Sequence, residues 1–279
     1  MSKRKKIRAI AVLPTMFTLG NLVCGFFAIV VASRIDKPNI ENIMGEADPW
    51  NLMVSASLIF LAMIFDALDG HVARLSRTTS DFGGQLDSLC DLVTFGVAPA
   101  FLLVKMCPNF ALEHRWEVWV IAAAFVACVA LRLARYNVET EEEDPHMDFS
   151  GLPSPAGGAA IASYAFMFYA LRVFPDRLRY AGTINSVAET ALPFFALFVA
   201  LLMVSRIRYP HVANQLFRGQ RSFAHVVGLV FALVVVVFIR HYAAPILFTL
   251  FVFTGPARLA WRELARRGEP RTEEDAIFE

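Results

Sequence analysis

The sequence predicts an all-α, polytopic integral membrane protein. Hydrophobic residues make up 57% of its 279 residues, and its mean hydropathy of +0.51 is far above that of a soluble domain. A membrane-spanning helix needs about 20 mostly apolar residues, and eight stretches of the chain meet this requirement. Their approximate bounds are 10–33, 50–74, 82–106, 116–136, 153–173, 188–205, 222–240 and 242–262.

The eight stretches differ in how clearly they are marked. The first follows a basic N-terminal segment and is too long for a typical signal peptide, so we expect a retained helix. The second and third contain a shared motif of carboxylates and are joined by a short polar loop, residues 76–80. A short loop also separates the third from the fourth. The fifth opens with Ser154 and Pro155, a pair suited to an N-cap and a first helical residue.

The last three stretches are predicted from length and apolar composition, and the seventh and eighth are nearly continuous. Most of the 26 Lys and Arg residues fall on the side of the N-terminus when the helices alternate in direction. Because basic residues concentrate in cytoplasmic loops, we expect both termini in the cytoplasm. The net charge is +1 and there is no basic stripe, so no nucleic-acid partner is expected.

Four carboxylates lie inside apolar segments: Asp66 and Asp69 in the second stretch, Asp87 and Asp91 in the third. Ionised carboxylates at membrane depth cost several kcal/mol each unless they are paired or neutralised. Spacings of three and four residues place each pair on one helix face, and the short loop makes the two helices antiparallel neighbours. The four carboxylates are therefore expected to converge on one site near the cytoplasmic surface.

Clustered oxygen ligands without His or Cys suit Mg²⁺, Mn²⁺ or Ca²⁺, and four carboxylates can hold two such ions. Two ions form the usual clamp for phosphoryl displacement. Gly70 and Ala73 leave room for a ligand on the same face, and Arg74 can hold a phosphate through two hydrogen bonds. An ion or proton pathway, or a structural cation site, remains open on these residues alone.

The full pattern is Asp66-x2-Asp69-Gly70-x2-Ala73-Arg74-x8-Gly83-x3-Asp87-x3-Asp91. It resembles the signature of the CDP-alcohol phosphatidyltransferase family at every signature position. The resemblance implies an enzyme that binds a CDP-linked lipid from the cytoplasmic leaflet, transfers the phosphatidyl group to an alcohol and releases CMP. It also implies a homodimer and a single membrane domain over 1–279. That domain would hold a six-helix catalytic core (about 10–206), two additional helices (about 222–262) and a polar cytoplasmic tail (263–279).

The same resemblance implies roles for individual residues. Asp66, Asp69 and Asp87 would bind Mg²⁺ or Mn²⁺, with two ions in the site. Asp91 would touch the second ion and act as the general base in a direct displacement without a phospho-enzyme. The CDP-lipid would be held by Asp66, Asp69, Gly70, Ala73, Arg74, Gly83, Thr18 and Asn21, although Thr18 and Asn21 could equally be helix-packing residues.

Four flanking motifs narrow the choice of alcohol. They are Leu13-Pro14-x3-Thr18-Leu19-Gly20-Asn21-Leu22, Phe95–Ala100, Arg132–Asn137 and Gly151–Ala156. Together they resemble the membrane-type phosphatidylserine synthases. This implies CDP-diacylglycerol and L-serine as substrates, and we expect a prokaryotic inner membrane as the location.

Several alternatives stay open at this point. Arg132, Arg135, Asn137 and Ser154 are candidates for binding the acceptor or the diphosphate, but the two arginines could also be ordinary cytoplasmic flank residues. Sister enzymes that use glycerol phosphate, inositol, inositol phosphate or choline share the central signature. A divalent-cation transporter is the alternative from another functional class, but it would need acidic residues across the whole membrane depth.

Overall fold

The computed structural model describes residues 2–35, 49–76, 81–108, 110, 115–141, 151–207, 209 and 241–268. Within these ranges the chain is helical and has no strand. Seven of the described segments are long and apolar enough to cross a membrane. The prediction of an all-α, polytopic membrane protein is therefore confirmed, while the predicted span 222–240 lies outside the described residues.

The first spanning helices follow the predicted order. The third predicted span is built from three consecutive helical segments. One boundary prediction was wrong, because the helix predicted at 188–205 begins at Ala181. The elements are α1 (Ser2–Ser33), α2 (Pro49–Ser76), α3 (Asp81–Asp91), η1 (Leu92–Val97), α4 (Ala98–Met106), α6 (Arg115–Glu141), α7 (Ser154–Val173), η2 (Pro175–Arg177), α8 (Ala181–Val204) and α11 (Ala243–Gly268).

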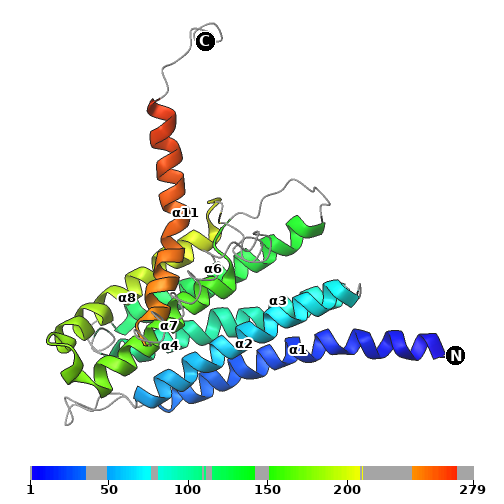
Figure 1. Ribbon diagram of the computed structural model, residues 1–279, viewed down its shortest axis with the longest axis horizontal. Helices are drawn as coiled ribbons and strands as arrows, with labels where there is room; N and C mark the ends of the chain where they lie inside the picture. Colours follow the sequence, from blue (N-terminus) through cyan, green and yellow to red (C-terminus); the bar gives the residue numbers. More distant parts are fainter. Residues whose placement is uncertain are drawn as a thin grey trace, which may run out of the picture.

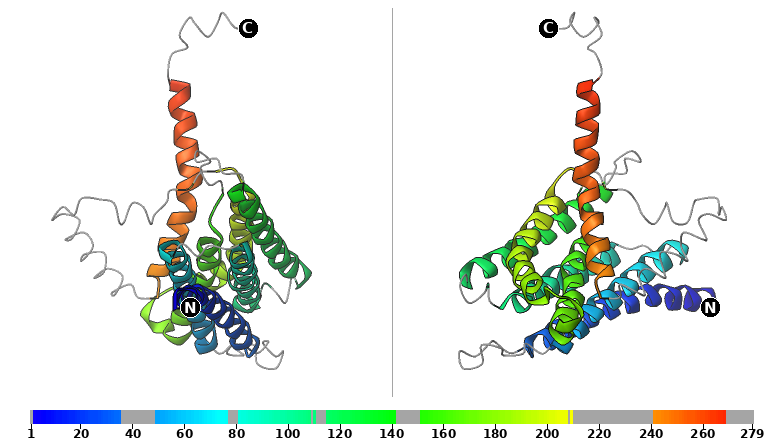
Figure 2. Two further views of the ribbon diagram at one scale, coloured as in Figure 1. Left: turned by 90° about the vertical axis from the view of Figure 1, so that its right-hand side faces the viewer. Right: turned by 60° about the vertical axis from the view of Figure 1, so that its left-hand side comes forward.

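The described spans form a helical bundle (Figure 1). Helix α1 packs along α2, α6 packs along α8, and α7 contacts α2, α8 and α11. In both views of Figure 2 the C-terminal half of α11 projects beyond the rest of the described bundle. The start of α3 and the end of α6 lie at the same end of the bundle as the N-terminus.

Helix α7 has the largest buried share of the seven candidate spans. Its N-terminal half is made of small residues, Ala156 to Ala160, which let neighbouring helices approach closely. At Gly158 an added Cβ would lie 2.8 Å from a backbone atom, the carbonyl oxygen of Phe95. Helix α7 therefore packs directly against the backbone that follows Asp91.

That backbone is a π-helix, η1, inserted between α3 and α4. The amide of Ala98 donates to the carbonyl of Val93, five residues earlier, and Pro99 follows in the first turn of α4. Proline has no amide hydrogen and its ring collides with the preceding turn of a regular helix, so the wider π-turn accommodates Pro99. Such turns are frequent at functional sites.

A buried ion pair lies near the other end of the bundle. Arg172 of α7 donates to Glu189 of α8 at 2.9 Å, and Glu189 is 2% exposed. The Arg172 guanidinium also donates to the Met106 carbonyl at 2.8 Å, and Asn185 donates to Glu189 at 2.6 Å. These bonds hold the polar first turns of α8 against α7, which is why α8 begins earlier than its apolar residues predict.

Aromatic residues mark this same end. Trp50 at the start of α2 and Trp116 and Trp119 at the start of α6 are exposed, and the Trp50 ring packs edge-on against Tyr169. Tryptophan is enriched where a membrane meets water. Trp50, Trp116 and Trp119 thus fit a membrane boundary at this end of the bundle.

Candidate metal and substrate site

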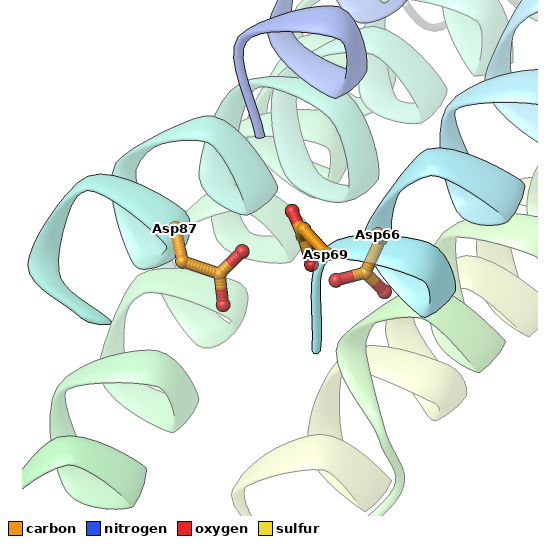
Figure 3. Close-up of side chains that lie close together, drawn as sticks. All are labelled: Asp66, Asp69 and Asp87. Carbon is orange, nitrogen blue, oxygen red and sulfur yellow. The ribbon is translucent and has the colours of Figure 1, made fainter. Parts of the chain in front are cut away.

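Three of the four predicted carboxylates form one cluster. Asp66 and Asp69 come from α2 and Asp87 comes from α3, and one oxygen of each lies within 4.8 Å of the others. Figure 3 shows the three side chains pointing into a shared space between the two helices. The helical spacing places Asp66 and Asp69 on one face of α2. Helices α2 and α3 both pack against α1 and make few direct contacts with each other, so the carboxylates meet across the space between them.

The donor set of this cluster fits a divalent cation. Asp69 is 5% exposed, and Asp69 Oδ2 and Asp87 Oδ1 are buried without a hydrogen-bond partner. Buried acceptors that lack a partner are costly, and three carboxylates so close together repel one another. A bound Mg²⁺ or Mn²⁺ would satisfy the oxygens and balance the charge.

Asp91 lies beside this cluster and has a different partner. Its Oδ1 accepts a hydrogen bond of 2.9 Å from Asn21 Nδ2 of α1, and both side chains are buried, at 6% and 0% exposed. Asp66 and Asp87 are the carboxylates whose charge it feels most strongly. Asp91 is therefore held by the first helix rather than by the α2–α3 hairpin alone.

The predicted CDP-lipid residues line the same region to different extents. Thr18 of α1 is buried and lies close to Asp69, and its hydroxyl donates to the Pro14 carbonyl at 3.1 Å. Space is open beside Gly70, as a bulky ligand would require. Gly83 lies in α3. Ala73 and Arg74 lie in α2, but their side chains are outside the described part of the structure.

Arg132 of α6 lies near two of the carboxylates. Its Nη1 donates to Ser154 Oγ at 2.7 Å, its Nε is buried without a partner, and it lies in the electrostatic field of Asp91 and Asp66. The suggestion that Ser154 caps α7 was wrong, because Ser154 is the first residue of the helix and Pro153 occupies the N-cap. Its hydroxyl is instead the partner of Arg132.

The segment before α7 fixes this arrangement. Gly151 has φ of 95°, a left-handed conformation that favours glycine. Its amide donates to the Ile207 carbonyl at 3.0 Å, and the Leu152 amide donates to the Leu202 carbonyl at 3.1 Å. The entry to α7, and with it Ser154, is therefore anchored on the end of α8.

Arg135 and Asn137 are engaged in contacts between helices. The Arg135 guanidinium donates to the carbonyls of Val204 and Ser205, both at 3.2 Å, and so satisfies carbonyls at the end of α8. Asn137 Nδ2 donates to Ser88 Oγ at 3.0 Å, which joins α6 to α3 next to Asp87. A role for these two residues in acceptor binding stays a prediction.

Sequence reasoning missed three features of the site. The π-turn after Asp91 has no signal in the sequence other than Pro99. The Asn21–Asp91 bond joins residues 70 positions apart, and no spacing rule pairs α1 with α3. Ser88 was not singled out, although it follows Asp87 directly.

Comparison with known proteins agrees with this geometry. A model of the CDP-alcohol phosphatidyltransferase family matches residues 11–205, which include every residue of the site described above. The chain belongs to the CDP-alcohol phosphatidyltransferase family. Members of this family are generally metal-dependent, and the Asp66–Asp69–Asp87 cluster is the acidic group that the described residues provide.

Several of its relatives in the CDP-alcohol phosphatidyltransferase family have names that refer to serine. The chain is 40% identical over 166 residues to the CDP-diacylglycerol–serine O-phosphatidyltransferase of Methanocaldococcus jannaschii, which covers 60% of this chain and 68% of the relative. It is 32% identical over 206 residues to the enzyme of that name from Helicobacter pylori, with 74% of each chain covered. The archaetidylserine synthase of Methanothermobacter thermautotrophicus is 31% identical over 215 residues, covering 76% of this chain and 75% of the relative.

Proposed function

We propose that this protein transfers the phosphatidyl group of CDP-diacylglycerol to the hydroxyl of L-serine, forming phosphatidylserine and CMP. The observation that carries the proposal is the group of three carboxylates from α2 and α3 within 4.8 Å of one another, inside a membrane bundle of this family. Serine as the acceptor is supported by relatives that are named for serine transfer.

In this proposal Asp66, Asp69 and Asp87 hold Mg²⁺ or Mn²⁺, and Asp91 contributes to a second ion. With divalent ions bound, the charge of the diphosphate is neutralised and the departing CMP is stabilised. The buried, unpartnered oxygens of Asp69 and Asp87 support this assignment. The open space beside Gly70 gives the nucleotide and its diphosphate room to approach α2, with Gly83, Ala73 and Arg74 completing the cradle.

Asp91 is the proposed general base. The serine hydroxyl oxygen forms a bond to the phosphatidyl phosphorus, the bond from that phosphorus to the CMP oxygen breaks, and the hydroxyl proton moves to Asp91. The phosphorus is displaced directly, so no covalent phosphatidyl-enzyme forms. Trapping such an adduct with radiolabelled CDP-diacylglycerol would contradict this step.

Arg132 is the proposed anion-binding residue on the α6 side. Its Nη1 is fixed by Ser154 while its Nε is buried and unpartnered. A guanidinium held in this way can bind a carboxylate or a phosphate with defined geometry. The serine carboxylate and the lipid diphosphate are the two anions that the reaction brings to the site.

The test is an acceptor series with purified protein. CDP-diacylglycerol and Mn²⁺ or Mg²⁺ are supplied with serine, glycerol phosphate, inositol, inositol phosphate or choline, one at a time, and CMP release is measured. Serine-dependent CMP is the expected result. CMP release with another alcohol alone would identify a sister enzyme, and metal flux into liposomes without lipid turnover would favour the transporter.

We also propose the topology, boundaries and assembly predicted from the sequence. Both termini face the cytoplasm and the site opens there, in a prokaryotic inner membrane. A catalytic core of about 10–206 precedes two further helices at 222–262 and the polar tail 263–279, and the protein forms a homodimer. Impermeant labelling of a cysteine placed at Trp116, compared with one placed at the C-terminus, tests orientation. Chemical cross-linking in membranes tests the dimer.

A further inference from the structure

Asn21 occupies a place in the site that a nucleotide contact does not explain. It lies on α1, outside the α2–α3 hairpin, and is 0% exposed. Its Nδ2 donates to Asp91 Oδ1 at 2.9 Å. Because an ionised carboxylate only accepts hydrogen bonds, the amide nitrogen must be the atom that faces Asp91. In this orientation the amide oxygen, Asn21 Oδ1, is turned away from the Asp91 oxygen that Nδ2 binds.

That amide oxygen, Asn21 Oδ1, is buried and has no hydrogen-bond partner. A buried amide acceptor without a partner is unfavourable. In a substrate complex it would be satisfied by a donor. The donors of the CDP-lipid lie on its cytosine and ribose, whereas the acceptor alcohol brings its hydroxyl, and in serine its ammonium group, to the reacting phosphorus beside Asp91. The CDP-lipid diphosphate offers only acceptors to such an atom.

The surrounding backbone holds Asn21 rigidly. Thr94 of η1, three residues after Asp91, donates through its hydroxyl to the Asn21 carbonyl at 3.2 Å. One turn further along α1, Gly25 faces Thr94 so closely that no Cβ would fit. Through Thr94 the first helix and the π-turn are thus fastened together next to the Asn21–Asp91 bond.

We propose that Asn21 is a positioning residue for the acceptor half of the reaction, orienting Asp91 through Nδ2 and receiving a hydrogen bond from the acceptor alcohol at Oδ1. This inference rests on the proposed function and replaces the expected contact of Asn21 with the CDP-lipid. It separates the site into two halves. The carboxylate cluster of α2 and α3 serves the donor lipid, and the α1–η1 junction serves the alcohol.

The test compares Asn21→Ala and Asn21→Asp with the wild-type protein in steady-state kinetics, with serine and CDP-diacylglycerol varied separately. Direct binding of CDP-diacylglycerol is measured on the same samples. The expected result is a fall of about 10- to 100-fold in kcat/KM for serine, with CDP-diacylglycerol binding changed less than about twofold. Asn21→Asp keeps the side-chain volume and removes the donor, so it should be impaired at least as much as Asn21→Ala.

Thr94→Val is the matched control, because it loosens the same α1–η1 junction while leaving the Asn21 side chain in place. It should lower thermal stability. It should change kcat/KM for serine and the binding of CDP-diacylglycerol by similar factors. Weaker CDP-diacylglycerol binding in Asn21→Ala with an unchanged kcat would overturn the proposal, as would wild-type kinetics in both Asn21 variants. If the wild-type protein uses a different alcohol, the proposed function fails, and the same comparison with that alcohol still decides the role of Asn21.

Discussion

Arg132 and Ser154 are joined by a hydrogen bond of 2.7 Å between α6 and α7. The bond fixes a guanidinium within the electrostatic field of Asp91 and Asp66 and leaves Arg132 Nε buried without a partner. A cation that is held on one side and unsatisfied on the other is suited to receive an anion. The carboxylate cluster and Arg132 thus supply opposite charges to the same space.

Arg132→Lys should lower kcat/KM by about tenfold or more, because a lysine ammonium cannot reproduce the planar fork of the guanidinium. The measurement is serine-dependent CMP release at varied concentrations of both substrates. Arg177→Lys is the control, since Arg177 lies at the other end of the bundle, in η2. If Arg132→Lys lowered kcat/KM no more than Arg177→Lys does, the planar guanidinium of Arg132 would not be needed for the reaction.

Asp69→Asn should reduce turnover by at least about 100-fold and raise the Mn²⁺ concentration needed for half-maximal activity, because the cluster loses a charged ligand. Metal titrations of CMP release measure both effects. Glu117→Gln removes an exposed carboxylate at the start of α6 and should behave like wild type. A metal requirement that is unchanged in Asp69→Asn would remove Asp69 from the metal site.

Gly158→Ala should destabilise the protein by about 1–3 kcal/mol, since the new Cβ must displace the Phe95 backbone. Because Phe95 belongs to the π-turn after Asp91, turnover should fall as well. Thermal unfolding in detergent and CMP release measure the two effects. Gly182→Ala is the control, because a Cβ at Gly182 meets open space. Normal stability in Gly158→Ala would mean that α7 can shift away from η1.

Glu189→Ala should destabilise the protein by about 3–5 kcal/mol, because it leaves the Arg172 guanidinium buried without its partner. The double change Arg172→Met with Glu189→Met should recover much of that loss, since an apolar pair of similar size is tolerated in place of a buried ion pair. Unfolding temperatures of the single and double variants measure this coupling. A double variant no more stable than Glu189→Ala would show that the pair is not coupled.

Much of this arrangement was predictable from local spacing. Helix periodicity places Asp66 and Asp69 on one face of α2, and the short connection keeps Asp87 of α3 at the same end of the bundle. Both features are visible in the sequence. Long apolar stretches predicted the spanning helices for the same reason. What depends on a repeating local geometry can be inferred from one chain.

The remaining features depend on contacts between distant segments. Asn21 reaches Asp91 across 70 positions, and Ser154 meets Arg132 only because Gly151 and Leu152 are anchored on the end of α8. The start of α8 was misplaced because its first turns are polar and are stabilised by Arg172 and Glu189. Tertiary packing determines these features, and the spacing of apolar residues along the chain does not reveal that packing.

The most direct test of the central claim is metal reconstitution of the wild-type protein. The protein is stripped with EDTA, dialysed and titrated with Mn²⁺ or Mg²⁺ in the presence of CDP-diacylglycerol and serine, and phosphatidylserine and CMP are measured together. We predict no product in the stripped protein and recovery of both products in equal amounts as the metal is restored. Full serine-dependent turnover by the metal-free protein would contradict the account.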